Sequence, residues 1–201
     1  MVKRGVLGGS FDPIHIGHLL IAEEVRQRLG LDEVVFVPAG QPWMKTAEAL
    51  ATASDRWEMV TLAIGDQKGF VASRVDLERA GPSYAGDTVR DLWRERGPAD
   101  DCVFIMGMDA LATLPEWHEV DAFLRLCRVA VVERLEVDRA SALERLEREL
   151  PGAAERVCFV QCGRFDINAT DIRRRVKEGR SIKHRVPPAV EEYIIKHGLY
   201  C

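Results

Sequence analysis

The chain has 201 residues, a net charge of −4 and 47% hydrophobic residues, which is typical of one globular domain with a buried core. The negative balance argues against a general nucleic-acid binder, because such proteins are usually basic. The apolar run near the N-terminus stops at Gly8 and is too short for a signal peptide or a membrane span. We therefore expect a cytoplasmic protein that binds neither nucleic acid nor a membrane.

Six short, mostly valine-rich runs alternate with longer amphipathic segments along the chain. Several of these runs show little polar alternation, which is typical of strands covered on both faces. The predicted strands are residues 4–7, 34–37, 70–73, 103–106, 129–132 and 157–160.

Helices are predicted between the strands. In the first, Leu19, Ala22, Val25 and Leu29 recur three or four residues apart, and Gly30 supplies a C-terminal stop. Further helices are predicted where a capping residue precedes an apolar pattern. The predicted N-caps are Ser54, Ser83 and Asp138, and a last helix begins near Pro188 and ends at Gly198.

Alternation of strands and helices predicts an α/β fold: a Rossmann-like, doubly wound and mainly parallel sheet with helices on both faces. We expect one domain over residues 1–201, with a helical C-terminal part from about residue 166 to 201. Ligands of such sheets bind beyond the carboxyl ends of the strands, where the strand order reverses. Residues 40–54 are predicted to form a long surface loop, and loops of that length are often functional.

The stretch GGSFDPIHIGH directly follows the first predicted strand. The backbone N–H groups of Gly8 and Gly9 can approach an anion closely, and a helix that starts soon afterwards favours negative charge at its N-terminus. Asp12 can cap the intervening turn. His15 and His18 are three residues apart and can share one face. The stretch therefore predicts a site for the phosphates of a nucleotide.

Two other interpretations of the histidine pair remain open. The spacing differs from the H-x-x-x-H of zinc enzymes and no third ligand is evident nearby, so a structural metal site is the weaker alternative. Both histidines can also serve simply as capping or surface groups.

The same stretch resembles the G-x-F-D-P-x-H-x-G-H signature of the nucleotidyltransferase superfamily. Four further segments occur in the order expected of bacterial nicotinate mononucleotide adenylyltransferases, and the resemblance runs nearly end to end. These segments are GPSYAGDT, MGMDALATLPEWHEV, INATDIRRRV and HGLY.

The resemblance implies transfer of AMP from ATP to nicotinate mononucleotide, giving nicotinate adenine dinucleotide and pyrophosphate. The attacking phosphate is already ionised at pH 7 and needs no general base. Catalysis then consists of positioning and charge neutralisation. Mg²⁺ is expected to bridge the ATP phosphates, with few protein ligands of its own.

The resemblance also implies the site residues. His15, His18 and Arg173 are the expected catalytic residues. The expected ATP-binding residues are Gly8, Gly9, Ser10, Phe11, His15, Gly17, His18, Gly107, Asp109, Asn168, Thr170 and Arg173. The expected residues for the second substrate are Lys45, Ser83, Tyr84, Ala85, Asp109, Trp117 and His118.

The resemblance further implies particular roles, which fit the chemistry of the residues. Asn168 can cap the helix that carries Thr170 and Arg173, and Arg173 is expected to reach the β/γ end of ATP. Trp117 can stack on the pyridine ring, and Asp109 can accept hydrogen bonds from a ribose.

Three departures from the family pattern bear on substrate choice. QPWMK replaces the usual P-P-H-K, Ala85 replaces a threonine, and ERLEVD lacks the usual R-P-G. Alternative acceptors, nicotinamide mononucleotide or phosphopantetheine, therefore remain open. A non-catalytic ATP-binding sensor and a homo-oligomer also remain open.

Overall fold

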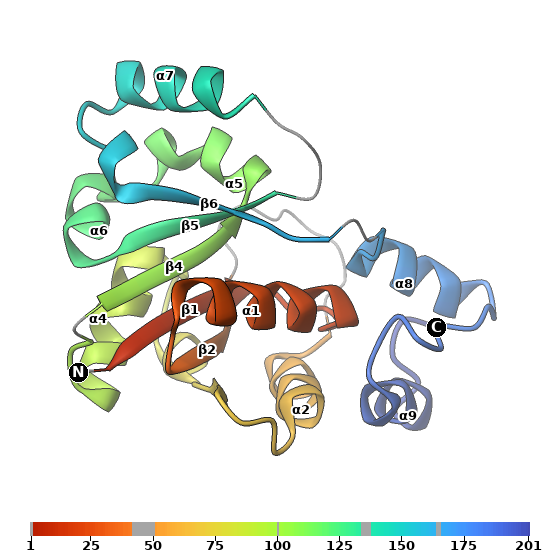
Figure 1. The fold of residues 1–201 in the computed structure, drawn as a ribbon. Coiled ribbons are helices and arrows are strands. Elements are labelled where there is room, and N and C mark those ends of the chain that lie inside the picture. The colour runs from red at the N-terminus through yellow and green to blue at the C-terminus, as the bar shows by residue number, and fades with distance from the viewer. Residues whose placement is uncertain (1, 42–50, 100, 134–137, 164–165) are drawn as a thin grey trace.

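The computed structural model describes residues 2–41, 51–99, 101–133, 138–163 and 166–201. It contains one six-stranded sheet between helices, with α8 and α9 beyond one end of β6 (Figure 1). All six predicted strands are present, with slightly shifted ends. They are β1 (Lys3–Gly9), β2 (Glu33–Pro38), β3 (Phe70–Ala72), β4 (Asp101–Gly107), β5 (Arg128–Glu133) and β6 (Val157–Gln161).

The sheet has the order β3-β2-β1-β4-β5-β6, and every neighbouring pair of strands is parallel. The chain builds outward from β1 to β3, then crosses back to β4 and builds outward to β6. The strand order therefore reverses between β1 and β4. Both strands are flanked by a partner on each side, and helices cover both faces of the sheet, which explains why Val6 and Val103 are fully buried.

The described helices follow the amphipathic segments of the sequence. They are α1 (Ile16–Leu29), α2 (Ala53–Ile64), α3 (Val75–Glu78), α4 (Ala85–Arg96), α5 (Met108–Ala112), α6 (Val120–Leu126), α7 (Arg139–Glu149), α8 (Ala169–Lys177) and α9 (Pro188–Lys196). Two single 3₁₀ turns accompany them, at Leu114–Glu116 and Ala154–Arg156.

The sheet buries a separate hydrophobic cluster on each face. One cluster packs α1, α2, α8 and α9 against the sheet through residues such as Val25, Met59 and Ile194. The other packs α4, α5, α6 and α7 through residues such as Leu92 and Phe123. The fold is thus the predicted doubly wound α/β sheet with helices on both faces (Figure 1).

The structure confirms two predicted helix boundaries. Gly30 follows α1 in the left-handed conformation with φ of 61°, which a glycine adopts without steric cost. Asp138 caps α7, because its side chain accepts a hydrogen bond from the Ser141 backbone N–H.

The other two predicted N-caps are wrong. Thr52, rather than Ser54, caps α2: its hydroxyl accepts from Asp55 N at 3.1 Å and donates to the Asp55 carboxylate at 2.6 Å. This reciprocal pair requires an acidic residue three positions after the cap, which Thr52 has and Ser54 lacks. Ser83 does not cap α4. Its hydroxyl instead accepts a hydrogen bond from Gly40 N at 2.9 Å.

Candidate active site

A cavity of about 510 Å³ lies at the carboxyl ends of β1 and β4, where the strand order reverses. This is the position predicted for a ligand in a doubly wound sheet. Its wall is formed by Leu7, Gly8, Gly9, Ser10, Phe11, Asp12, His18, Ile21, Ala39, Asp76, Ser83, Ala85, Thr88, Phe104, Ile105, Met106, Gly107, Ala110, Trp117, Val132 and Ala169.

The loop after β1 forms one side of this cavity. Four of the residues predicted to bind ATP line it: Gly8, Gly9, Ser10 and Phe11. Arg56 holds the loop from behind, since its side chain is 2% exposed and its guanidinium donates to Ser10 O at 2.9 Å. The buried Arg56 guanidinium therefore fixes the position of this loop without a ligand.

Arg56 also joins this loop to the next one. Its guanidinium donates to Ala39 O at 2.6 Å and to Gly40 O at 3.3 Å, and its Nε donates to Ala51 O at 3.3 Å. Burial lowers the pKa of Arg56, opposed by its attraction to Asp12. Sequence analysis missed Arg56, because nothing in the local pattern distinguishes it from a solvated helix residue.

His15 and His18 lie together at the start of α1, as their spacing predicted. The rings stack with centroids 3.7 Å apart, and His15 N donates to His18 Nδ1 at 3.2 Å. Because His18 Nδ1 accepts this bond, the proton of the neutral ring is on Nε2. His18 lines the cavity, whereas His15 is 3% exposed and is not part of the cavity wall. Gly17 is buried in the first turn of α1.

Asp12 does not cap the turn, contrary to its predicted role. Its carboxylate is 1% exposed and accepts hydrogen bonds from Tyr200 Oη at 2.7 Å and from Ala51 N at 3.0 Å. Both partners lie far from Asp12 in sequence. The tertiary contacts therefore take precedence over the local turn bond that an aspartate commonly makes.

Asp12 also connects the two predicted phosphate-binding segments. Arg173, on α8, donates from Nη1 to Asp12 O at 2.8 Å, and the same nitrogen lies 3.8 Å from Asp12 Oδ2. Asn168 caps α8 as predicted, since its side chain accepts from Asp171 N at 2.8 Å. Two segments 161 residues apart are thus brought to one place.

Thr170 lies on a different side of α8. It lines a separate polar hollow with Asp166, Asn168, Asp171, Arg174, Arg175 and Arg185. The basic run of residues 173–185 is partly neutralised here, because Arg174, Arg175 and Arg185 all pair with Asp171.

Three of the residues predicted for the second substrate line the opposite side of the cavity: Ser83, Ala85 and Trp117. Trp117 is half-buried and meets Phe104 edge-to-face, with ring centroids 6.0 Å apart. Its ring is therefore held by aromatic packing on one side while the residue contributes to the cavity wall.

The remaining predicted residues lie around this side of the cavity rather than in its wall. Tyr84 and His118 stack on each other, with ring centroids 4.3 Å apart and His118 exposed. Asp109 is exposed in the first turn of α5, next to Gly107, which does line the cavity. Lys45, together with the departures at Trp43 and Met44, lies outside the described residues.

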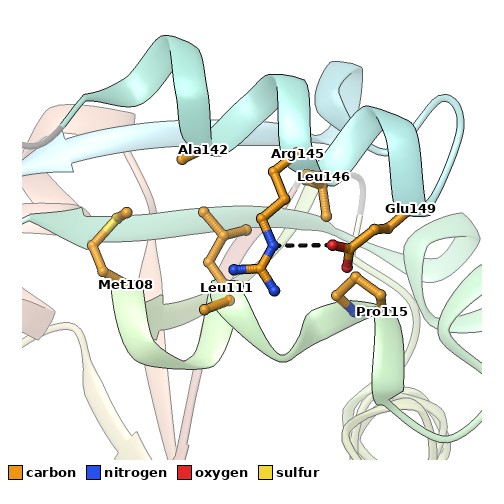
Figure 2. A pocket seen from close by; sticks show the side chains of 8 residues that line it. Met108, Leu111, Pro115, Ala142, Arg145, Leu146 and Glu149 are labelled. Atoms are coloured by element: carbon orange, nitrogen blue, oxygen red, sulfur yellow. Dashed lines mark hydrogen bonds and ion pairs between the residues drawn. The ribbon is translucent and has the colours of Figure 1, made fainter.

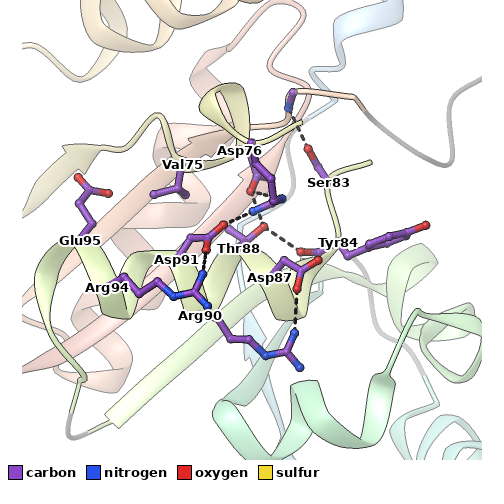
Figure 3. A network of polar contacts seen from close by, with 12 residues as sticks. Val75, Asp76, Ser83, Tyr84, Asp87, Thr88, Arg90, Asp91, Arg94 and Glu95 are labelled. Atoms are coloured by element: carbon purple, nitrogen blue, oxygen red, sulfur yellow. Dashed lines mark hydrogen bonds and ion pairs between the residues drawn. The ribbon is translucent and has the colours of Figure 1, made fainter. Parts of the chain in front are cut away.

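A buried carboxylate that sequence analysis missed orders this side of the site (Figure 3). Asp76 is 4% exposed and accepts from Thr88 Oγ1 at 2.7 Å and from Arg79 Nη2 at 2.6 Å. Burial raises the pKa of Asp76, opposed chiefly by the Thr88 hydrogen bond. Thr88 belongs to the GPSYAGDT segment, so this motif is the sequence signal that could have pointed to the network around Asp76.

Gly40 packs directly against this network. A Cβ at this position would meet Asp76 O at 2.2 Å, a distance that only glycine avoids. The Ser83 hydroxyl accepts from Gly40 N, so the loop after β2 is tied to the segment that precedes α4 (Figure 3).

A second, apolar hollow lies between α5 and α7 (Figure 2). Its volume is about 70 Å³, far too small for a nucleotide. Arg145 Nε donates to Glu149 Oε1 across its edge at 3.0 Å, beside Leu111 and Leu146. This hollow is a packing gap rather than a second substrate site.

Within the part of the chain that the structure describes, no three His, Cys, Asp or Glu side chains form a cluster that could hold a metal ion. No described helix has the length and apolar character needed to cross a membrane. The five cysteines all lie in the described residues and form no disulfide.

Comparison with known proteins identifies the family. Residues 6–175 match the cytidylyltransferase-like family model. The chain is 41% identical over its whole length to a probable nicotinate-nucleotide adenylyltransferase of Dehalococcoides mccartyi, covering 98% of that protein. It is 44% identical to the probable nicotinate-nucleotide adenylyltransferase of Thermomicrobium roseum, covering 100% of this chain and 92% of that one. The chain belongs to the nicotinate-nucleotide adenylyltransferases.

Solved structures confirm the fold of this family. The Plasmodium falciparum nicotinic acid mononucleotide adenylyltransferase complexed with NaAD superposes with a TM-score of 0.78, at 18% identity over 100% of this chain and 98% of that one. The same enzyme complexed with APC gives a TM-score of 0.75 at 19% identity, again over 100% and 98% of the two chains. At 18% and 19% identity, the similarity to these two structures shows only that the sheet and the helices are arranged in the same way.

Proposed function

We propose that this protein transfers AMP from ATP to nicotinate mononucleotide, releasing pyrophosphate and forming nicotinate adenine dinucleotide. The observation that carries the proposal is the contact of Arg173 with Asp12. It joins the two predicted phosphate-binding segments beside a cavity at the switch point of the sheet. Curated relatives with this activity in their names match the chain from end to end.

In the proposed reaction, the phosphate of the mononucleotide attacks the α-phosphorus of ATP, and the bond to the leaving pyrophosphate breaks. This nucleophile carries its negative charge at pH 7, so the protein does not need to remove a proton from it. The protein contributes position and neutralisation of charge on the phosphoryl oxygens.

The phosphates of ATP are assigned to the loop after β1 and to His18. The backbone N–H of Gly8 and the Nε2–H of His18 are the donors on this side, while the Gly9 N–H is used in the pairing of β1 with β2. The assignment of His18 is supported by the bond from His15 N, which leaves Nε2 as the protonated nitrogen. Arg173 is assigned to the β/γ end, where its positive charge stabilises the leaving group.

The nicotinate ring is assigned to the side of the cavity that Trp117 lines. Ala85 is the first residue of α4, and its backbone N–H is one of the groups at that helix N-terminus without an intrahelical acceptor. Such a donor favours the carboxylate of nicotinate over the amide of nicotinamide. The replacement of threonine by alanine at this position leaves the backbone contact possible.

We propose Mg²⁺ as the cation that enters with ATP. Mg²⁺ is commonly held by phosphate oxygens and water with few protein ligands. When bound, it neutralises charge on the phosphates. We further propose that the chain acts as a single domain in the cytoplasm.

Pyrophosphate release tests this function. The protein would be given ATP and Mg²⁺ with nicotinate mononucleotide, nicotinamide mononucleotide or phosphopantetheine in separate reactions. We expect strong release with nicotinate mononucleotide. Pyrophosphate release with only one of the other acceptors would mean that this acceptor is the substrate. ATP binding with no pyrophosphate release for any acceptor would favour a non-catalytic sensor.

A further inference from the structure

The C-terminal HGLY segment contains a residue, Tyr200, that the proposed reaction does not yet use. Tyr200 follows α9 in the HGLY segment and adopts φ of 67°, a left-handed conformation that is strained for a tyrosine. Its ring packs against the hydrophobic cluster of α1, α2, α8 and α9. Its hydroxyl donates to Asp12 Oδ1 at 2.7 Å, across 188 residues of sequence. A strained conformation persists when its contacts hold it in place.

The partner of Tyr200 lies in the phosphate-binding loop. Asp12 follows Phe11 directly, and both residues are buried. The backbone carbonyl of the same Asp12 accepts from Arg173 Nη1 at 2.8 Å. Tyr200 therefore contacts the residue that positions Arg173.

The charges around Asp12 make its orientation sensitive. The Arg173 guanidinium forms an ion pair with Asp12 Oδ2 at 3.8 Å, while Tyr200 and Ala51 donate hydrogen bonds to Oδ1. Burial, and then the bond to Asp12, raise the pKa of Tyr200 far above its usual range, so its hydroxyl remains a donor at working pH. The hydroxyl fixes one oxygen of the carboxylate, while the other oxygen and the Asp12 backbone carbonyl contact Arg173.

We propose that Tyr200 is a positioning residue for ATP: by fixing Asp12, it sets the position of the Arg173 guanidinium, which pairs with Asp12, relative to the phosphate-binding loop. The assignment rests on the proposed function of Arg173. Without the hydroxyl, the buried carboxylate loses one of its two described hydrogen bonds. Asp12 then shifts, and the Arg173 guanidinium that pairs with it shifts away from the position in which it meets the ATP phosphates.

The chain offers a matched comparison for this idea. Tyr193, on α9, donates from its hydroxyl to Asp55 Oδ1 at 2.9 Å, so it also links the C-terminal segment to a carboxylate. Asp55, however, lies in the first turn of α2 and does not line the cavity. Tyr193→Phe removes the same type of bond without touching the phosphate-binding loop.

The test compares Tyr200→Phe with Tyr193→Phe in the full chain. The readouts are kcat, the KM for each substrate, the affinity for a non-hydrolysable ATP analogue and the melting temperature. For Tyr200→Phe we expect the KM for ATP and the dissociation constant of the analogue to rise about tenfold, with the KM for nicotinate mononucleotide unchanged. For Tyr193→Phe we expect both ATP values to stay at the wild-type level.

Unchanged ATP values in Tyr200→Phe, or equal losses in the two variants, would overturn the proposal, because the hydroxyl would then only anchor the chain end. The analogue separates this result from failure of the proposed function. A wild-type protein that binds the analogue but transfers no AMP refutes the function, while weaker analogue binding by Tyr200→Phe still supports the positioning role. A wild-type protein that does not bind the analogue overturns both.

Discussion

At the scale of single residues, the contacts of His18 define what it can do. Its Nδ1 accepts from the His15 backbone, its ring stacks on His15, and Phe11 meets it edge-to-face with centroids 5.0 Å apart. The ring is therefore held in one orientation and one tautomer, so that Nε2 is its remaining donor. Sequence spacing placed the two histidines together, but only the structure shows that His18 lines the cavity and that His15 is buried outside its wall.

Replacing His18 by alanine tests this assignment. We expect His18→Ala to lower kcat at saturating ATP by about 100-fold, because one preorganised donor to a developing charge is lost. The melting temperature should change little by comparison. The exposed His197 provides the control, and His197→Ala should retain the wild-type kcat. Equal kcat values in the two variants would contradict the phosphate role of His18.

The tryptophan of the cavity wall gives a second prediction. We expect Trp117→Ala to raise the KM for nicotinate mononucleotide roughly tenfold, since the pyridine ring loses its stacking surface. Trp57 is a matched control, because it lies under Arg74 at 5.1 Å, away from the cavity. Steady-state kinetics with each substrate varied would decide the point. A rise in the KM for ATP instead would mean that the ring is assigned to the wrong substrate.

At the scale of elements, helix α2 shows why caps are hard to place from sequence. Thr52, Ser54 and Asp55 are all acceptable capping residues, and the choice among them depends on which one forms a reciprocal pair. We expect Thr52→Ala to lower the free energy of unfolding by about 1 kcal/mol. Ser54→Ala should have almost no effect on it. Denaturant unfolding of both variants measures the difference, and a larger loss for Ser54→Ala would contradict the observed cap.

The same helix should give part of the pH dependence of stability. The Thr52 hydroxyl, and then the Tyr193 hydroxyl, lower the pKa of Asp55. The stabilisation from its ionised form is therefore present above the unfolded pKa of about 4 and is lost as the pH falls through the lower folded value. We expect the destabilisation caused by Tyr193→Phe to be larger at pH 7 than at pH 3. A difference that does not change with pH would show that the bond to Asp55 is independent of its charge.

At the scale of the whole molecule, the alternation of apolar runs was enough to predict the fold. Valine-rich strands buried on both faces and amphipathic helices between them leave few arrangements other than a doubly wound parallel sheet. The reversal of strand order between β1 and β4 then places the end of β1, with its glycines, at the site.

The parts of the site that could not be predicted are its long-range contacts. Arg56 reaches Ser10 across 46 residues, and Tyr200 reaches Asp12 across 188. No local pattern in the sequence indicates such pairs, because each partner has an ordinary local alternative: a helix surface for Arg56 and a turn bond for Asp12. The burial of Asp76 could not be predicted either, because a charged residue in a short helix is normally exposed to solvent.

The most direct test of the account is a crystal structure of this protein with nicotinate adenine dinucleotide bound. We predict that its phosphates lie against Gly8, Gly9 and His18 Nε2, and that its pyridine ring lies beside Trp117 in the cavity of about 510 Å³. Product bound in the polar hollow beside Asp171 and Arg185, with the cavity empty, would contradict the account.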